Sequence, residues 1–293
     1  MTEIKYDLMK HKKLWFIISL LVIIPGLISL TFQGLNLGID FTGGNLWHLK
    51  FTEVVDTAQV RQVLADYGLE GSTIQSISNN EYIIRTKVVD QDTTAAILNS
   101  FSSQVGSYES LRNELVGPVI GQELTLKALY ALLIAAILMV VYITYRFEWS
   151  FAVAAIAAIM HDVLITLSVF SIFQIEIDSA FVAAILTVIG YSINDTIVIF
   201  DRIRENVKYR KSGTLEELVN ASVWQTMGRS INTGLTVVFV LLAMLFFGGE
   251  TTKVFVLALL IGVISGAYSS IFNASPIWLK LKGWEKKRKR IVA

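Results

Sequence analysis

The sequence predicts a membrane protein: an all-α bundle of six transmembrane helices, with one α+β domain inserted on the extracytoplasmic side between the first and second helices. Hydrophobic residues make up 54% and charged residues 17% of the 293 residues. A soluble protein of this length could not cover that much apolar surface. Six apolar runs approach or exceed the about 20 residues that cross a bilayer. Residues 34–120 are instead polar and mix helix and strand periodicities.

The first apolar run has a basic flank and resembles the hydrophobic region of a cleaved signal peptide. The run is long for that role, and Ser29-Leu30-Thr31 is a poor cleavage signal, so we expect an uncleaved anchor. The six predicted spans are Leu14–Phe32, Leu124–Tyr145, Phe151–Phe173, Ala180–Phe200, Ile231–Phe247 and Val254–Trp278.

Most of the 25 lysine and arginine residues lie on one face of this six-helix arrangement. They fall in the N-terminal head, the 146–149 turn, the 201–229 loop and the C-terminal tail, whereas the outer turns 174–179 and 248–253 hold only Lys253. The positive-inside rule therefore places both termini in the cytoplasm. We expect the basic tail, Lys286–Arg290, to anchor the topology against anionic lipid; docking to a ribosome or translocase is the alternative.

The chain therefore divides into four predicted parts: 1–33 with the first span, the extracytoplasmic domain 34–120, the helical bundle 121–281 with its cytoplasmic loop 201–229, and the tail 282–293. The elements of the domain alternate as βαββαβ, the arrangement of ferredoxin-like domains. Asp56 and Gln59 have capping-box spacing at the first helix. The predicted elements are strands Asn45–Phe51, Ser72–Ser78, Glu81–Lys87 and Ser107–Val116 and helices Asp56–Tyr67 and Asp92–Gln104.

Several kinds of chemistry are not expected. The chain has no cysteine, and His11, His48 and His161 stand far apart without metal-ligand spacing. No phosphate-binding loop of the Walker type occurs, so nucleotide hydrolysis is not expected. We therefore expect no enzyme activity, no cofactor, no metal and no nucleic-acid partner, and any work the protein performs must draw on another energy source.

Ionisable residues inside spanning helices are costly and usually functional. Asp195 lies in the fourth span, roughly 8 Å deep at 1.5 Å per residue, and Arg229 opens the fifth span from the same side. Burial favours the protonated form of a carboxylate, and a nearby guanidinium favours the charged form. The two residues are therefore candidates for proton coupling, with Asn194 and Thr196 as hydrogen-bonding neighbours.

Structural roles compete with this interpretation. Asp195 and Arg229 could form a static ion pair, or Arg229 could extend to the lipid headgroups. Asp162, near the middle of the third span beside His161, is a further proton-coupling candidate, although a hydrogen bond to a neighbouring helix would also explain it. The small residues Gly262, Gly266 and Ser270 on the last span are explained by close helix packing.

Two glycine-containing stretches flank the inserted domain, and by physics alone they predict tight turns. They are the stretches LGIDFTGG, with Gly38, Asp40, Phe41, Gly43 and Gly44, and VGPVIG, with Gly117, Pro118 and Gly121.

These stretches, together with three others in register, resemble the SecF family of protein-export membrane proteins. The others are HDV at 161–163, TVIGYSINDTIVIFDRIREN at 187–206 and RSINT at 229–233. The resemblance covers almost the whole chain and implies an arrangement of the resistance-nodulation-division (RND) type in a bacterial cell membrane.

The resemblance also implies a function. Members work with SecD beside the SecYEG channel and use the proton motive force to promote polypeptide export after SecA has begun it. YajC-type or YidC-type accessory proteins and membrane lipids are further implied contacts. The family's proton-transfer residues correspond to Asp195 and Arg229. Some relatives fuse SecD and SecF into twelve helices, so this six-helix chain should need a separate SecD.

Two other functions compete. A proton-coupled exporter of lipids or small molecules would need a large apolar pocket in the outer domain, and typically two such domains in twelve helices. A scaffold or insertase accessory would only hold partners together, and its function would not depend on protons.

Overall fold

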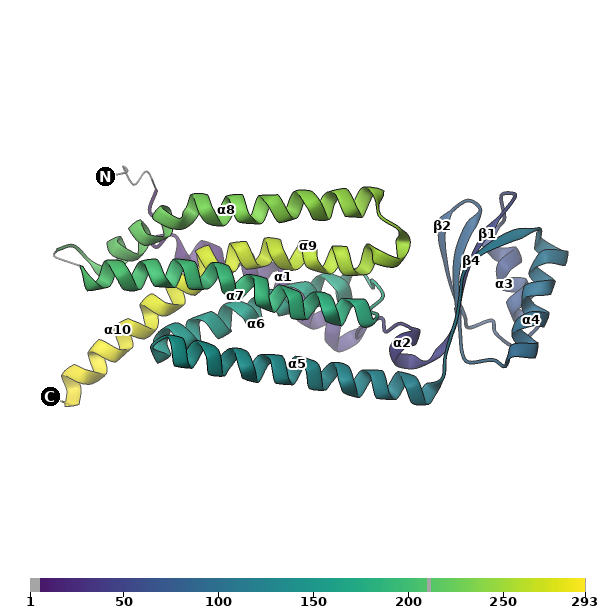
Figure 1. The fold of residues 1–293 in the computed structure, drawn as a ribbon, viewed down its shortest axis with the longest axis horizontal. Coiled ribbons are helices and arrows are strands. Elements are labelled where there is room, and N and C mark those ends of the chain that lie inside the picture. Colours follow the sequence, from purple (N-terminus) through teal and green to yellow (C-terminus); the bar gives the residue numbers. More distant parts are fainter. Residues whose placement is uncertain (1–5, 210–211, 293) are drawn as a thin grey trace. The chain divides into compact units, whose positions relative to one another are not determined.

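The computed structural model describes residues 6–209 and 212–292, without the side chains of residues 250, 251 and 286–292. It divides into two compact units. One comprises residues 37–130 and contains a β-sheet; the other combines residues up to 36 with those from 131 onward and is helical (Figure 1). The tail residues Lys286–Arg290, predicted to meet lipid, lie outside the described side chains.

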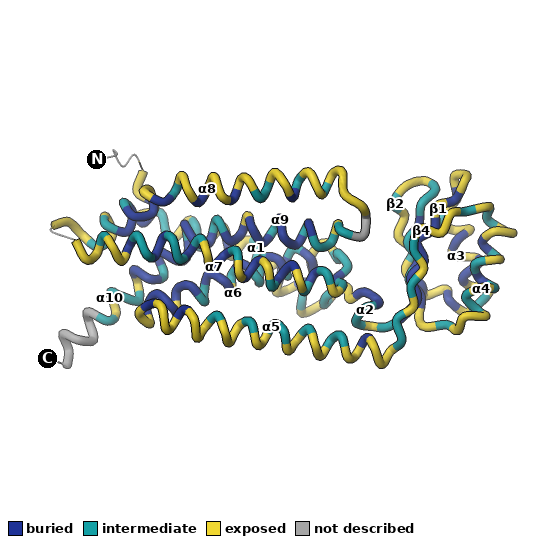
Figure 2. The backbone as a smooth tube through the Cα atoms, in the orientation of Figure 1, coloured by how far each residue is buried: buried dark blue, intermediate teal, exposed yellow. Residues whose placement is uncertain are grey.

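Among the residues that the structure describes, six helices are long and apolar enough to cross a membrane, which confirms the predicted number. Within the helical unit, α9 is largely buried, whereas α8 exposes most of its surface (Figure 2). The bounds are α1 (Lys12–Phe32), α5 (Pro118–Arg146), α6 (Trp149–Ile172), α7 (Ser179–Lys208), α8 (Leu215–Phe247) and α9 (Glu250–Ser269), which continues through the π-helical turn η2 (Ser270–Ala274) into α10 (Ser275–Val292).

Two helices extend well beyond the predicted apolar runs. α8 begins at Leu215 rather than Ile231, because Thr214 and Glu217 form a capping box that starts the helix among polar residues. The last span passes through η2 into α10, which begins at Ser275 and continues past Trp278. The apolar runs therefore mark where a helix can cross the bilayer and not where it ends.

Small residues allow the helices of the bundle to approach closely. Gly262 of α9 packs on Val188 of α7, and a Cβ atom at Gly266 would lie 3.1 Å from Ser192 Cβ. Gly26 of α1 packs in the same way on α6. The packing role predicted for the small residues of α9 is confirmed at Gly262 and Gly266.

Replacing Gly262 by Ala should weaken the contact between α7 and α9, because the new methyl group would overlap the Val188 side chain. We expect a destabilisation of about 1–3 kcal/mol, measured from the unfolding midpoint of the purified chain in detergent. Gly190→Ala on α7 is the matched control, since its methyl group would meet open space. Equal midpoints for the two variants would contradict this account of the helix contact.

The unit of residues 37–130, called the outer unit below after its predicted side of the membrane, contains an antiparallel four-stranded sheet in the order β2-β3-β1-β4. Its strands and two main helices follow one another in the predicted βαββαβ order, and the short helix α2 (Ile39–Thr42) was not predicted. The remaining bounds are β1 (Gly44–Phe51), α3 (Thr57–Ala65), β2 (Thr73–Ser78), β3 (Glu81–Thr86), α4 (Gln91–Ser100), the π-helical turn η1 (Phe101–Val105) and β4 (Tyr108–Val116).

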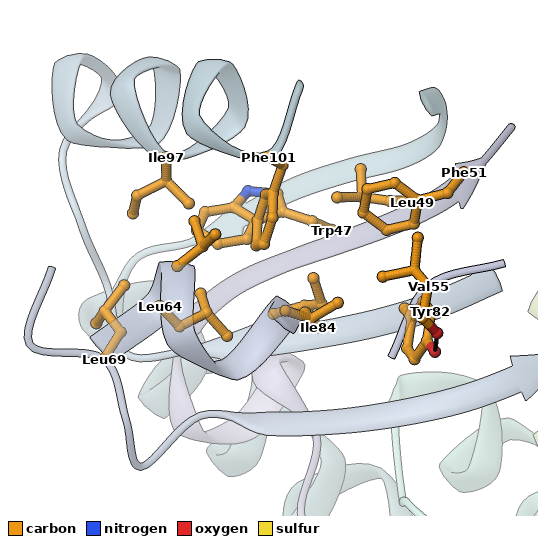
Figure 3. Close-up of a cluster of buried hydrophobic side chains, with 12 residues drawn as sticks. Trp47, Leu49, Phe51, Val55, Leu64, Leu69, Tyr82, Ile84, Ile97 and Phe101 are labelled. Carbon is orange, nitrogen blue, oxygen red and sulfur yellow. Dashed lines mark hydrogen bonds between the residues drawn. The ribbon is translucent and has the colours of Figure 1, made fainter. Parts of the chain in front are cut away.

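The core of the outer unit lies between the sheet and these helices (Figure 3). Trp47 and Ile84 project from the central strands toward Leu64, Ile97 and Phe101, and all five side chains are fully buried. The predicted capping box of Asp56 and Gln59 is present at the start of α3. Burial of large apolar side chains on one face of a sheet supplies the main driving force for folding this unit.

The stability of the first turn of α4 should depend on pH. The Thr93 amide and hydroxyl donate to the Asp90 carboxylate at 2.8 and 2.9 Å, and these bonds, the amide bond foremost, lower the pKa of Asp90. Because the pKa of Asp90 is lower in the folded state than its unfolded value of about 4, the ionised carboxylate stabilises the folded helix above that pH. This stabilisation is lost as the pH falls through the lowered pKa of the folded state. Hydrogen-exchange protection factors across α4 should fall in that window. In Asp90→Asn this fall should disappear; an unchanged pH profile would contradict the assignment.

Candidate functional site

Asp162 of α6 is fully buried in the helical unit and receives hydrogen bonds from neighbouring helices. Ser192 of α7 and Ser269 of α9 donate to its Oδ2 at 2.6 and 2.8 Å, and Ser265 of α9 donates to its Oδ1 at 2.7 Å. We refer to Ser192, Ser265 and Ser269 as the serine cage. The cage joins α6, α7 and α9 around one carboxylate.

His161 extends this cluster to α1. Its Nδ1 lies 2.9 Å from Asp162 Oδ1, and its Nε2 lies 2.9 Å from Ser19 Oγ. The Asn273 amide of η2 donates to the same Ser19 oxygen at 3.0 Å. Both oxygens of Asp162 are thus hydrogen-bonded, which suits a fixed structural junction between the helices.

Asp195 of α7 has a different environment. It is half-buried and accepts one hydrogen bond, from Ser230 of α8 at 2.5 Å. Its second oxygen, Oδ2, is buried with no hydrogen-bond partner among the described residues. A buried polar atom without a partner is uncommon and costly, and such atoms are found where a structure serves chemistry or exchange. Asp195 therefore has a free acceptor position that Asp162 lacks.

The other predicted residues around Asp195 occupy different places. Arg229 is exposed on α8 and, within the described part of the chain, forms no salt bridge with Asp195. Asn194 is exposed on α7. Thr196 is buried, and its hydroxyl contacts the Ser192 carbonyl at 3.2 Å and Ser270 Oγ at 2.7 Å. Asp195 thus contacts Ser230, the residue after Arg229. Thr196 instead belongs to the contact between α7 and η2.

Polar groups near Asp195 also lie on the outside of the helical unit. Asn194, Arg229, Asn232 and Thr233 are exposed on α7 and α8, and we call these four residues the polar strip. The Tyr191 hydroxyl donates to the Thr233 carbonyl at 3.0 Å and so connects the two helices next to the strip. Exposed polar groups on spanning helices normally face another protein or a water-filled cavity.

The two glycine stretches of the outer unit pack against each other. Gly43 has φ +73°, and a Cβ atom at Gly121 would lie 3.0 Å from the Phe41 carbonyl oxygen and 3.1 Å from the Gly43 nitrogen. Gly44 pairs with Val116 at the start of the sheet. The glycines are therefore needed for close backbone contact.

The remaining residues of these stretches begin short segments of regular structure. Gly38 is the N-cap of α2, which contains Asp40, and Pro118 is the first residue of α5, where its missing N–H costs nothing. Gly117 precedes it in an open position.

Comparison with known families gives two matches. The model "Protein export membrane protein SecD/SecF, C-terminal" matches residues 96–284, and the "SecD/SecF GG Motif" model matches residues 28–46. The chain belongs to the SecD/SecF family. The resemblance expected from the sequence is confirmed. The SecD/SecF motif covers Gly43 and Gly44, the glycines at the backbone contact described above.

Individual SecD/SecF relatives match over almost all of this chain. It is 42% identical to the protein translocase subunit SecF of Sebaldella termitidis, over 97% of this chain and 94% of the relative. It is 45% identical to the protein translocase subunit SecF of Acidaminococcus fermentans, over 98% of this chain and 99% of the relative. It is 41% identical to the protein translocase subunit SecDF of Bacillus subtilis over 97% of this chain but 39% of the relative.

A solved structure has the same fold. The crystal structure of SecDF from Thermus thermophilus, a translocon-associated membrane protein, aligns with a TM-score of 0.89 at 34% identity. The alignment covers 97% of this chain and 40% of the SecDF chain.

Sequence reasoning missed the serine cage and Ser230. The spacing of Ser265 and Ser269 by four residues places both on one helix face, which was the available signal. Their partner was not predictable from spacing, because the bonds reach Asp162 from a different helix.

Proposed function

We propose that the chain is the SecF subunit of a protein translocase, promoting polypeptide export across a bacterial cell membrane with energy from the proton motive force. The observation that carries this proposal is identity of 42–45% with translocase SecF subunits over nearly the full length of both chains. We further propose that both termini are cytoplasmic, that the outer unit is ferredoxin-like, and that the helices have an RND-type arrangement.

A separate SecD-type chain is the proposed partner. In the SecDF relatives the part matched here is 39–40% of one longer chain. The polar strip supports this assignment, because Asn194, Arg229 and Asn232 would otherwise face hydrocarbon. The complex would act beside SecYEG after SecA has begun transfer, with YajC-type or YidC-type proteins as further candidates and the exported polypeptide as substrate.

Asp195 is the proposed proton carrier, and protons are the coupling ion. Its unpartnered Oδ2 offers a place for a proton without breaking the bond from Ser230. Arg229, on the adjacent turn of α8, could pair with the carboxylate after a side-chain or helix movement and favour its charged form. Asp162 would act as a rigid junction about which α6, α7 and α9 move together.

The available energy fits such a cycle. One proton moved across 100 mV gains about 2.3 kcal/mol, and each unit of pH difference adds about 1.4 kcal/mol. One or two protons per cycle would therefore shift a two-state equilibrium of the outer unit substantially. No further cofactor is needed for this proposal.

The proposal is tested with vesicles that contain a Sec channel, a SecD-type protein and this chain. Export of a polypeptide, started by SecA and ATP, should be faster with a proton gradient than after an ionophore has collapsed it. The difference should vanish when this chain is left out. An export rate that does not depend on the gradient would contradict the coupled role and favour a scaffold.

A further inference from the structure

A groove lies in the helical unit between α1 and α10, two helices that are labelled in Figure 1. It has a volume of about 720 Å³ and lies between the first turns of α1 and the helix α10. Its walls are apolar, with Phe16 on one side and Ile277 and Leu281 on the other. The groove is therefore wide enough for an acyl chain and is continuous with helices that would lie in a bilayer.

Basic side chains surround this groove. Lys12 and Lys13 line it from α1, and Lys280 lines it from α10, where its Nζ lies 5.4 Å from the centre of the Trp284 ring. Glu216 is the one acid among the lining residues and lies 3.1 Å from Lys12 Nζ. The groove thus keeps an excess of positive charge.

Two of these lysines are available to a ligand. Lys13 and Lys280 are exposed and, among the described residues, neither forms an ion pair. The bond between Lys12 and Glu216 is itself exposed, at 43% and 60%, and such pairs contribute little. Lys282, by contrast, is held by Glu148 and Glu285. An anion entering the groove would therefore meet two ammonium groups that no described carboxylate pairs with.

We propose that this groove binds one anionic phospholipid. The phosphate lies between Lys13 and Lys280, the acyl chain runs along Phe16 and Leu281, and Trp284 lies at the headgroup level. Basic groups beside an apolar groove at the end of spanning helices match the two halves of such a lipid, because lysine favours an anionic headgroup and Trp favours the interface. The chain's own basic tail would be repelled by the same lysines.

The test is native mass spectrometry of the purified full chain in detergent, titrated with phosphatidylglycerol or with phosphatidylcholine. Wild type should retain one phosphatidylglycerol in preference to phosphatidylcholine. The double variant Lys13→Gln, Lys280→Gln should bind phosphatidylglycerol about 25-fold more weakly, at about fivefold for each lysine.

The matched control is Lys10→Gln, Lys208→Gln, which removes two exposed lysines outside the groove and should bind as wild type does. Equal unfolding midpoints establish that the variants are folded. Equal retention of the two lipids, or equal weakening in both double variants, would overturn the site. Displacement of the lipid by an equal concentration of inorganic phosphate would overturn the role of the acyl groove, and preferential binding of an acidic peptide would assign the groove to a protein partner.

Discussion

Replacing Asp195 by Asn is expected to abolish the part of export that depends on the proton gradient. Asn has nearly the same shape and retains an oxygen that can accept the hydrogen bond from Ser230, so the contact between α7 and α8 should persist. The amide of Asn, however, cannot take up or release a proton at the pH of the export assay. Export with a gradient should therefore fall to the rate observed after the gradient is collapsed.

The measurement compares export into vesicles with and without an ionophore at equal levels of each subunit. Asp201→Asn is the matched control on the same helix. Asp201 lies near the end of α7 in exposed ion pairs with Arg146 at 3.4 Å and Arg204 at 3.0 Å, so its loss should leave the gradient effect intact. Full gradient stimulation in Asp195→Asn would contradict the coupled role, and loss of stimulation in both variants would show a general charge effect.

Replacing Asp162 by Ala is expected to give the largest loss of stability among single substitutions in the bundle. It leaves the hydroxyls of the serine cage and the His161 ring without their acceptor. Hydrogen bonds between membrane helices contribute about 0.6 kcal/mol on average and up to about 1.7 kcal/mol. The four bonds and the added cavity therefore amount to a destabilisation on the order of 2–5 kcal/mol.

Detergent-induced unfolding of the purified chain measures this loss. Ser168→Ala on the same helix is the control. Within the part of the chain that the structure describes, the buried Ser168 hydroxyl has no hydrogen-bond partner, so its removal should be neutral. The destabilisation caused by Asp162→Asn should lie between those of Asp162→Ala and Ser168→Ala, because Asn keeps one carbonyl acceptor. A loss for Asp162→Ala no greater than that for Ser168→Ala would contradict the structural junction.

Much of the fold was predictable because its signals are local. Apolar runs indicate spanning helices wherever they occur, and alternation and capping residues indicate the strands and helices of the outer unit. The Thr214–Glu217 spacing was also present in the sequence and would have placed the start of α8 correctly. The short helix α2 was harder to predict, because four residues contain no period.

The sequence indicated which residues of α7 and α8 lie at a similar level along the helices, but not which way their side chains point. Position along the helices placed Asp195 and Arg229 at the same level, and that inference needs only the rise per residue. Which face each side chain occupies depends on how α7 and α8 rotate against each other. In the structure Ser230 meets Asp195 while Arg229 is exposed. The bonds of Asp162 likewise depend on three helices meeting, which no single helix specifies.

The proton carrier proposed above is the Asp195 carboxylate. Infrared difference spectroscopy detects the carbonyl band of a protonated carboxylic acid as pH is varied, in the complex of this chain with its SecD-type partner. Wild type should show a pH-dependent band that is absent from Asp195→Asn and retained in Asp162→Asn. A band that persists in Asp195→Asn and disappears in Asp162→Asn would contradict the proposed role of Asp195.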